Sequence, residues 1–325
     1  MRSSRALVLV SAVSLASLLA GCSSSTPATT QASTSAPTAS ASQAPTGAGE
    51  VQTIAYADAS PTQTLQLYRP SDTTGPVPLV VLIHGGAFEM GDASMEADYA
   101  RELVDNGFAV AAVNYRLSGE AAYPAGAQDV KSAVRYLRAN AAEYGINPDQ
   151  IAAWGQSAGG YLANLLGATG DQETIFDDQS TANATESSAV QAVVSWFGPS
   201  NFATMDEQAA EVAACEGRAQ VHGDASSPES RWLGDAVDTS DQTASTNLSA
   251  YVAKAQTLPA WYLAHGDADC LVPEGQSAEL KVALDDAGAP ATYAVLEGAG
   301  HMDPAFDSTQ LQPTIDFLKR TFGMA

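Results

Sequence analysis

Short apolar runs alternate with longer amphipathic stretches along most of this chain. The apolar runs have the length of buried strands and lie at Leu79–Ile83, Ala109–Asn114, Ile151–Trp154, Val190–Phe197, Ala260–Ala264 and Thr292–Leu296. The stretches between and after them predict helices near Met95–Asn106, Gly126–Tyr144, Ala158–Gly167, Glu274–Ala287 and Ser308–Phe322. Strands that alternate with helices predict an α/β fold, with a mostly parallel central sheet and helices on both of its faces.

Two further segments extend this pattern. Val51–Tyr56 and Thr64–Tyr68 alternate between apolar and polar residues, which predicts an opening antiparallel hairpin. Gly198–Leu258 lies between two predicted core strands and has no clear periodicity, so we expect it to form an insertion. The residues from Glu50 onward, 50–325, have the length of a single domain with a large core.

The first 49 residues differ from the rest of the chain. Arg2 and Arg5 precede a short apolar stretch, Ala6–Leu18, that is too short for an ordinary membrane span. Leu19-Ala20-Gly21-Cys22 follows and resembles a bacterial lipobox, which predicts a lipoprotein signal peptide over residues 1–22 and lipidation of Cys22. The alternative is an ordinary secretory signal with a chance cysteine. Both predict export, with the protein anchored by lipid on the outer face of the bacterial membrane, or secreted.

Residues 23–49 contain Ser, Thr, Ala, Pro, Gln and Gly and no charged side chain. Such a composition buries too little apolar surface to offset the entropy of ordering, so we expect a disordered tether. The whole chain carries a net charge of −23, which argues against nucleic acid as a partner. If Cys22 is lipidated, Cys215 and Cys270 remain as an even pair in an oxidising compartment, and we predict a disulfide between them.

A candidate nucleophile stands in Gly155-Gln156-Ser157-Ala158-Gly159, between an apolar run and a predicted helix. Strand, G-x-S-x-G and helix together are typical of a nucleophile elbow, in which glycines leave room for a sharp turn that exposes the serine hydroxyl. The alternative is an ordinary turn serine. The backbone N–H of Ala158 would lie beside that hydroxyl and could help to bind an oxyanion.

Candidate partners of Ser157 follow other predicted strands, at the end of the sheet where open α/β folds bind ligands. Histidine His301 follows the last strand, while Asp267 and Asp269 follow the strand before it. The order Ser, acid, His favours His301 as the base over His265, which precedes both acids. Spacing alone does not separate Asp267 from Asp269.

The other histidines are assigned to supporting or surface positions. His84 opens His84-Gly85-Gly86-Ala87-Phe88, and we expect it to brace that loop. His222 lies in a polar stretch, and we expect it to be exposed. The histidines and cysteines lack zinc-site spacing, so we predict neither a metal nor a cofactor.

These motifs together resemble the α/β-hydrolase carboxylesterases, in particular the hormone-sensitive-lipase-like and bacterial feruloyl and acetyl-xylan esterase group. The resemblance rests on Leu82–Phe88, Val113–Leu117, Gly155–Gly160, His265–Asp269 with Val272-Pro273, and Gly300-His301. It implies that Asp269 is the acid, that Gly86 and Ala87 contribute to the oxyanion hole, and that the disulfide would join the insertion to the acid's loop. Ala87 replaces the third glycine of the family's loop, and Gln156 replaces a frequent Asp.

The expected function is hydrolysis of short acyl or aryl carboxylic esters, small or linked to polysaccharide, outside the cytoplasm and through an acyl-Ser157 intermediate. The alternatives are an amide or formamide hydrolase of the same fold and a non-catalytic binding lipoprotein. Four aromatic residues are candidates both for the substrate pocket and for ordinary core packing: Phe88, Tyr123, Trp196 and Phe197. The sequence gives no oligomeric state.

Overall fold

The structure is a computed structural model, and it describes residues 51–325 apart from residues 72 and 171. The expected signal peptide (residues 1–22), with Cys22, and the expected tether (residues 23–49) therefore lie outside the described residues. Within the described part of the chain, no helix is both long enough and apolar enough to cross a membrane.

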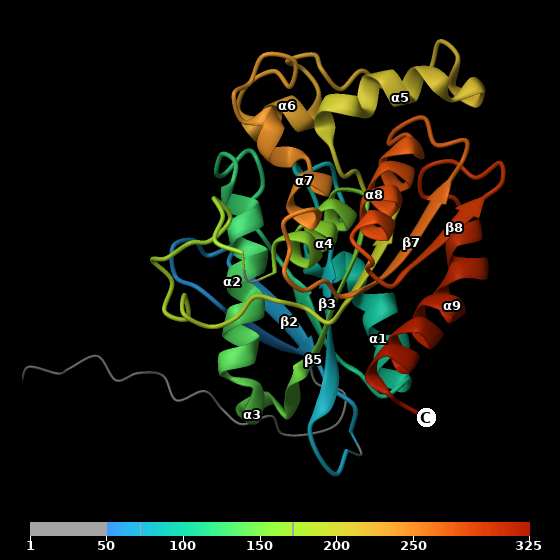
Figure 1. The fold of residues 1–325 in the computed structure, drawn as a ribbon. Helices are drawn as coiled ribbons and strands as arrows, with labels where there is room; N and C mark the ends of the chain where they lie inside the picture. The colour runs from blue at the N-terminus through green and yellow to red at the C-terminus, as the bar shows by residue number, and fades with distance from the viewer. Residues whose placement is uncertain (1–50, 72, 171) are drawn as a thin grey trace, which may run out of the picture. The chain divides into compact units, whose positions relative to one another are not determined.

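A single eight-stranded sheet forms the centre of the described domain (Figure 1), with the strand order β1-β2-β4-β3-β5-β6-β7-β8. The pairs β1–β2 and β2–β4 are antiparallel, and the other neighbours are parallel. The strands are β1 Gln52–Ala55, β2 Thr64–Tyr68, β3 Val77–Ile83, β4 Ala109–Val113, β5 Ile146–Gln156, β6 Ala192–Trp196, β7 Ala260–Gly266 and β8 Ala291–Leu296. The opening hairpin and the mostly parallel sheet are as predicted.

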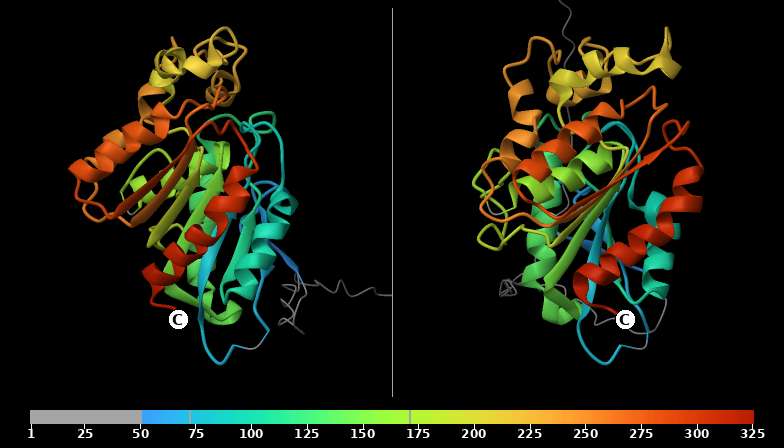
Figure 2. Two further views of the ribbon diagram at one scale, coloured as in Figure 1. Left: turned by 90° about the vertical axis from the view of Figure 1, so that its right-hand side faces the viewer. Right: turned by 45° about the vertical axis from the view of Figure 1, so that its right-hand side comes forward.

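Helices cover both faces of the sheet (Figure 2), because alternate residues of each central strand point to opposite sides. On β3, Leu79, Val81 and Ile83 belong to one hydrophobic cluster and Val80 and Leu82 to the other. The first face is covered by α2 (Ala125–Ala139), α4 (Ala158–Thr169) and α8 (Gly275–Asp286), and the second by α1 (Ala97–Asp105) and α9 (Ala305–Phe322). The predicted helix over 126–144 is divided into α2 and the short α3 (Ala141–Tyr144).

The insertion between β6 and β7 folds into short helices that stand over the carboxyl ends of the parallel strands (Figures 1 and 2). The helices there are α5 (Met205–Glu211) and α6 (Pro228–Leu233), whereas α7 (Ser249–Val252) packs beside α4 and α8. None is longer than two turns, which explains why the sequence of this region has no clear helical period.

The prediction that His222 is exposed was wrong, since its side chain is 1% exposed inside the insertion. The backbone N–H groups of His222 and Gly223 donate to the carboxylate of Asp206 at 2.6 and 2.8 Å. The His222 Nδ1 atom lies 3.1 Å from the Glu229 carboxylate, which is also buried. The insertion therefore has a small polar interior of its own, which a polar stretch of sequence does not reveal.

A buried ion cluster joins α2 to the loop after α4. The Lys131 ammonium lies 2.8 Å from the carboxylate of Asp177, which also pairs with Arg135, and both the Lys131 and Asp177 side chains are almost fully buried. Burial by itself would raise the pKa of Asp177, but hydrogen bonds and the charge of Lys131 outweigh it and lower that pKa. Asp177 is therefore ionised in the folded state.

Replacing Asp177 with Ala should lower the free energy of unfolding by ~3 kcal/mol at pH 7, because it removes the carboxylate that neutralises the buried Lys131 and Arg135 cations. A lowered pKa in the folded state stabilises the protein above the usual carboxyl pKa, and this contribution is lost as pH falls. The deficit of the variant, measured by urea denaturation, should therefore shrink below about pH 4. Asp98→Ala is the control, since the Asp98 side chain is 97% exposed beside Arg101, and equal stabilities of the two variants would contradict the prediction.

Candidate active site

Ser157 stands at the turn between β5 and α4 with a φ of +54°, a backbone conformation that side-chain-bearing residues seldom adopt. The two flanking glycines are required by space. A Cβ on Gly155 would lie 2.1 Å from the carbonyl oxygen of Gly159, and a Cβ on Gly159 would lie 2.0 Å from that of Ile83. The turn therefore has the tight geometry expected for a nucleophile elbow.

The structure brings Ser157, His301 and Asp269 together in one hydrogen-bonded chain. The His301 Nε2 atom lies 2.9 Å from the Ser157 hydroxyl, and its Nδ1 atom lies 2.7 Å from the Asp269 carboxylate. Since a carboxylate only accepts, Nδ1 carries the proton and Nε2 presents its lone pair to the hydroxyl of Ser157. This is the arrangement that a serine nucleophile and its base require.

Asp269 is 1% exposed, and its carboxylate is surrounded by donors. Its Oδ1 atom accepts the backbone N–H groups of Leu271 and Val272 at 2.8 and 2.9 Å. Burial alone would raise the pKa of Asp269, but hydrogen bonds from His265 and His301 outweigh it and hold the pKa of that carboxyl well below its usual range. Asp269 therefore remains an anion beside His301.

The competing residues occupy other positions. Asp267 is exposed and accepts the backbone N–H of Gly298 at 2.6 Å, so it fixes the loop before His301. His265 is fully buried, with Nδ1 2.7 Å from the Ser277 hydroxyl and Nε2 2.9 Å from the carbonyl of Val272. His265 thus holds the acid's loop and does not face Ser157.

The loop that follows β3 passes directly beside the elbow. A Cβ on Gly85 would lie 3.0 Å from the carbonyl oxygen of Gln156 and 3.4 Å from the Cβ of Ser157. Gly86 and Ala87 have φ values of +109° and +56°. Ala87 stands where the resembling esterases have a third glycine, and it adopts a left-handed conformation that glycine would adopt more easily. Ala158 is the first residue of α4, where the N–H has no partner inside the helix.

Buried aromatic rings support this loop from behind. The His84 ring stacks on Tyr115 at 4.4 Å, and its Nδ1 atom lies 2.7 Å from the carbonyl of Gly85. Burial lowers the pKa of His84, so its ring stays neutral. On the other side, Phe88 stacks on Trp232 of α6 at a centroid distance of 4.1 Å.

An ion pair between Arg231 of α6 and Glu89, neither of which the sequence singled out, also holds the loop that follows β3. The Arg231 guanidinium donates to both carboxylate oxygens of Glu89, one of them at 2.7 Å. This hydrogen bonding lowers the pKa of Glu89 and raises that of Arg231. No motif marks these two residues, and because they are 142 positions apart only the tertiary structure shows the pairing.

Of the four aromatic pocket candidates, each is at most 5% exposed and packs in the core: Phe88, Tyr123, Trp196 and Phe197. Phe197 also places its ring edge-on to His301 at 4.7 Å. Among the described residues, no three His, Cys, Asp or Glu side chains are grouped as a metal ion would require.

A disulfide joins Cys215 of the insertion to Cys270, the residue after Asp269, with Cα atoms 5.3 Å apart. The backbone N–H of Gln220 also donates to the carbonyl of Cys270 at 3.1 Å. Through these two contacts the insertion is attached to the loop that carries the acid.

Comparison with known proteins is consistent with this geometry. The BD-FAE family model matches residues 65–284, which is more than half of the chain. The chain belongs to the BD-FAE family. This BD-FAE protein is 28% identical over 264 residues to "Esterase LipQ" of Mycobacterium tuberculosis, covering 80% of its own length and 58% of LipQ. It therefore spans less than two thirds of that relative.

Two solved structures are similar to the BD-FAE protein at more than 30% identity. One is a "truncated form of carbohydrate esterase from gut microbiota", with 32% identity, a TM-score of 0.75, and coverage of 84% of this chain and 96% of that one. The other is a "bifunctional GH43-CE" of Bacteroides eggerthii, with 33% identity, a TM-score of 0.72, and coverage of 82% and 37%. The predicted α/β-hydrolase fold and the resemblance to its esterases are confirmed.

Replacing both Cys215 and Cys270 with Ser should destabilise this BD-FAE protein by about 4 kcal/mol, since the bridge closes a loop of 55 residues in the unfolded chain. Urea denaturation of the variant and the wild type measures the difference. The single variant Cys215→Ser is the control and should lose a similar amount. Thiol titration of the folded wild type should detect neither cysteine, and finding both as free thiols would contradict the prediction.

Proposed function

We propose that this protein is an exported serine esterase that hydrolyses carboxylic esters, in particular short acyl or aryl esters, through an acyl-Ser157 intermediate. The observation that carries the proposal is the hydrogen-bonded chain from Ser157 through His301 to the buried Asp269 carboxylate. A binding protein would have no need of a buried carboxylate that orients a histidine toward a serine hydroxyl.

In the proposed mechanism, the Ser157 oxygen attacks the ester carbonyl carbon while His301 Nε2 takes the hydroxyl proton. The Asp269 carboxylate stabilises the imidazolium that forms. The carbonyl oxygen becomes an oxyanion, for which the backbone N–H groups of Gly86, Ala87 and Ala158 are the candidate donors. His301 then gives its proton to the leaving alcohol as the C–O bond breaks.

Water completes the cycle by the same steps. It loses a proton to His301 Nε2 as it attacks the acyl-Ser157 carbonyl, and that proton returns to the serine oxygen when the acid product leaves. In both halves of the cycle Nε2 must be unprotonated when the attack begins.

The packing behind the loop that follows β3, residues 84–88, favours a short acyl group. We call this segment the oxyanion loop. Phe88 is surrounded there by the rings of Tyr161, Phe202 and Trp232, and none of the four side chains is more than 1% exposed. A long alkyl chain would have to displace one of these rings from a closely packed cluster, which is costly. The similar solved structure that is named a carbohydrate esterase supports an ester carried by a sugar.

Two features support export. The Cys215–Cys270 disulfide suits an oxidising compartment. The lipobox ending at Cys22 would attach the protein to the outer face of the membrane by lipid, or a plain signal would release it.

Ser157→Ala in a soluble form beginning at Glu50 tests the proposal. Turnover of p-nitrophenyl acetate should fall by at least ~10³-fold, because the variant lacks the nucleophile, while circular dichroism and thermal unfolding stay unchanged. An ester series from acetate to long chains should show a preference for short chains. No turnover of any ester by the folded wild type would favour an amide or formamide hydrolase, and equal turnover by the variant would contradict a Ser157 mechanism.

Asp269→Asn should lower kcat for p-nitrophenyl acetate by about 10⁴-fold, because an amide at this position favours the wrong tautomer of His301. Asp267→Asn is the matched control on the same loop and should retain most of the activity. If the Asp267 variant lost more activity than the Asp269 variant, the assignment of the acid would be wrong.

A further inference from the structure

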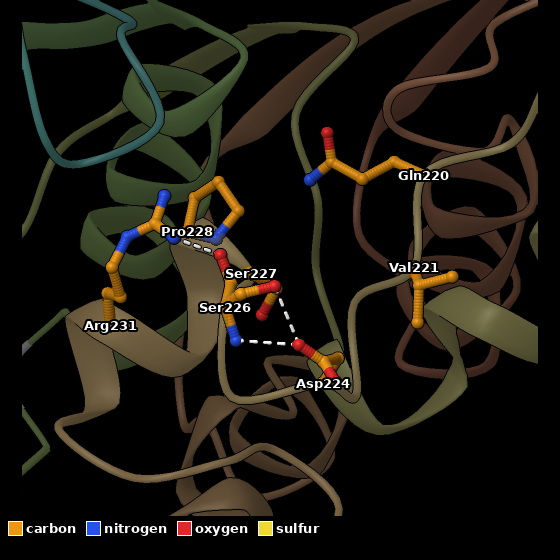
Figure 3. Close-up of a pocket in the computed structure, with 7 residues that line it drawn as sticks. All are labelled: Gln220, Val221, Asp224, Ser226, Ser227, Pro228 and Arg231. Atoms are coloured by element: carbon orange, nitrogen blue, oxygen red, sulfur yellow. Dashed lines mark hydrogen bonds between the residues drawn. The ribbon is translucent and has the colours of Figure 1, made fainter.

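The connection between β6 and β7 begins at Phe197 and continues into the insertion. Within the insertion, a hollow beside α6 is lined by residues between Gln220 and Arg231 (Figure 3), and the proposed mechanism uses none of them. The first residue of the connection, in contrast, contacts the proposed base. Phe197 is 2% exposed and lies edge-on to the His301 ring, with centroids 4.7 Å apart and an angle of 66° between the ring planes.

The backbone of Phe197 has an unusual conformation, with a φ of +41°. Bulky residues seldom adopt a positive φ, and the surrounding structure must maintain it where they do. Among the residues that the structure describes, the non-glycine residues with positive φ are Ala87, Phe88, Ser157, Phe197 and Met302. Apart from Phe197, these lie in the oxyanion loop, at the nucleophile and directly after His301. Because such strain collects at functional sites, Phe197 is a candidate for a role in the reaction.

Contacts on both sides maintain this backbone conformation. The Phe197 N–H donates to the carbonyl of Ala264 on β7 at 2.8 Å. Gly198 follows, and a Cβ there would lie 2.8 Å from an α-carbon of α4. Just before Phe197, the carbonyl of Trp196 accepts the backbone N–H of Ser157 at 3.0 Å. The end of β6 therefore contacts the nucleophile through its backbone and the base through a side chain.

A second buried ring fixes the Phe197 side chain. Phe306, at the start of α9, is 2% exposed and packs edge-on against Phe197 with centroids 4.6 Å apart. Aromatic rings in a closely packed core have few other orientations available. Phe197 therefore presents a rigid surface to the imidazole of His301.

The imidazole needs such a surface most in the acyl-enzyme. In the free enzyme, His301 is held at both ring nitrogens, by the Ser157 hydroxyl and by the Asp269 carboxylate. Once Ser157 is acylated its oxygen carries no proton, so of these two hydrogen bonds only the one to Asp269 remains. A ring held at one atom can pivot, whereas Nε2 must still face the water that attacks the acyl carbonyl.

We propose that Phe197 is a positioning residue that holds the His301 imidazole in its catalytic orientation while the acyl group is attached to Ser157. The inference rests on the proposed esterase function. Deacylation depends on Phe197 more than acylation does, because the Ser157 hydroxyl also orients the imidazole during acylation.

Phe197→Leu tests the proposal with p-nitrophenyl acetate, because leucine fills much of the space without providing a flat ring. At saturating substrate, the ratio of acetyl-Ser157 enzyme to unacylated enzyme equals the acylation rate divided by the deacylation rate. Mass spectrometry of the acid-quenched protein should show that this ratio rises about 10-fold in the variant. The value of kcat/KM, which reports acylation, should stay within about threefold of the wild type. A side chain that only packs in the core would not slow one step more than the other.

Further variants separate the ring from its packing. Phe317→Leu makes the same change in the same hydrophobic cluster, where the ring lies against Tyr262, and it should leave both steps within about twofold. Phe197→Tyr keeps the six-membered ring and should keep the ratio close to that of the wild type. If circular dichroism shows that Phe197→Leu does not fold, Phe197→Met makes the same test with a flexible side chain.

The outcomes distinguish the inference from the proposed function. If the folded wild type forms no acetyl-enzyme and hydrolyses no ester, the proposed function fails and the inference fails with it. If the wild type is active and Phe197→Leu slows both steps equally, or neither, the positioning role is refuted and the esterase stands. An equal rise of the ratio in Phe197→Tyr or in Phe317→Leu would also refute that role.

Discussion

The lack of space around the β5–α4 turn is the constraint on which the rest of the site depends. Ser157 is held at a positive φ by a turn in which neither Gly155 nor Gly159 has room for a Cβ. The carbonyl of Ile83, which fills the space beside Gly159, belongs to the strand that leads into the oxyanion loop. The strain of the turn is therefore maintained by the packed sheet, and the same contact sets the oxyanion loop against the nucleophile.

The surroundings of Asp269 show how the fold stabilises a buried carboxylate. An uncompensated carboxylate at this depth would be costly, but Asp269 accepts two backbone N–H groups as well as the His301 ring. His265, near the end of β7 and just before the acid's loop, is fixed by contacts with Ser277 and with the carbonyl of Val272 in that loop. The charge that orients His301 is thus stabilised by groups that take no part in the proposed chemistry.

The insertion connects the two loops that the sheet holds apart. It reaches the acid's loop through the Cys215–Cys270 disulfide, and it reaches the oxyanion loop through Arg231 and Trp232 of α6. The insertion therefore joins the loop that carries the acid to the loop that follows β3.

The sequence by itself determined the sheet, its helices and the elbow, because strand periodicity and a glycine-flanked serine are local properties of the chain. It also supplied His301, through the order of residues at strand ends. It did not separate Asp267 from Asp269 without the family resemblance, since both follow the same strand, and only the fold shows which carboxylate meets the ring. The burial of His222 and the pairing of Arg231 with Glu89 were likewise decided by tertiary structure, because they depend on contacts between segments whose spacing in the chain carries no pattern.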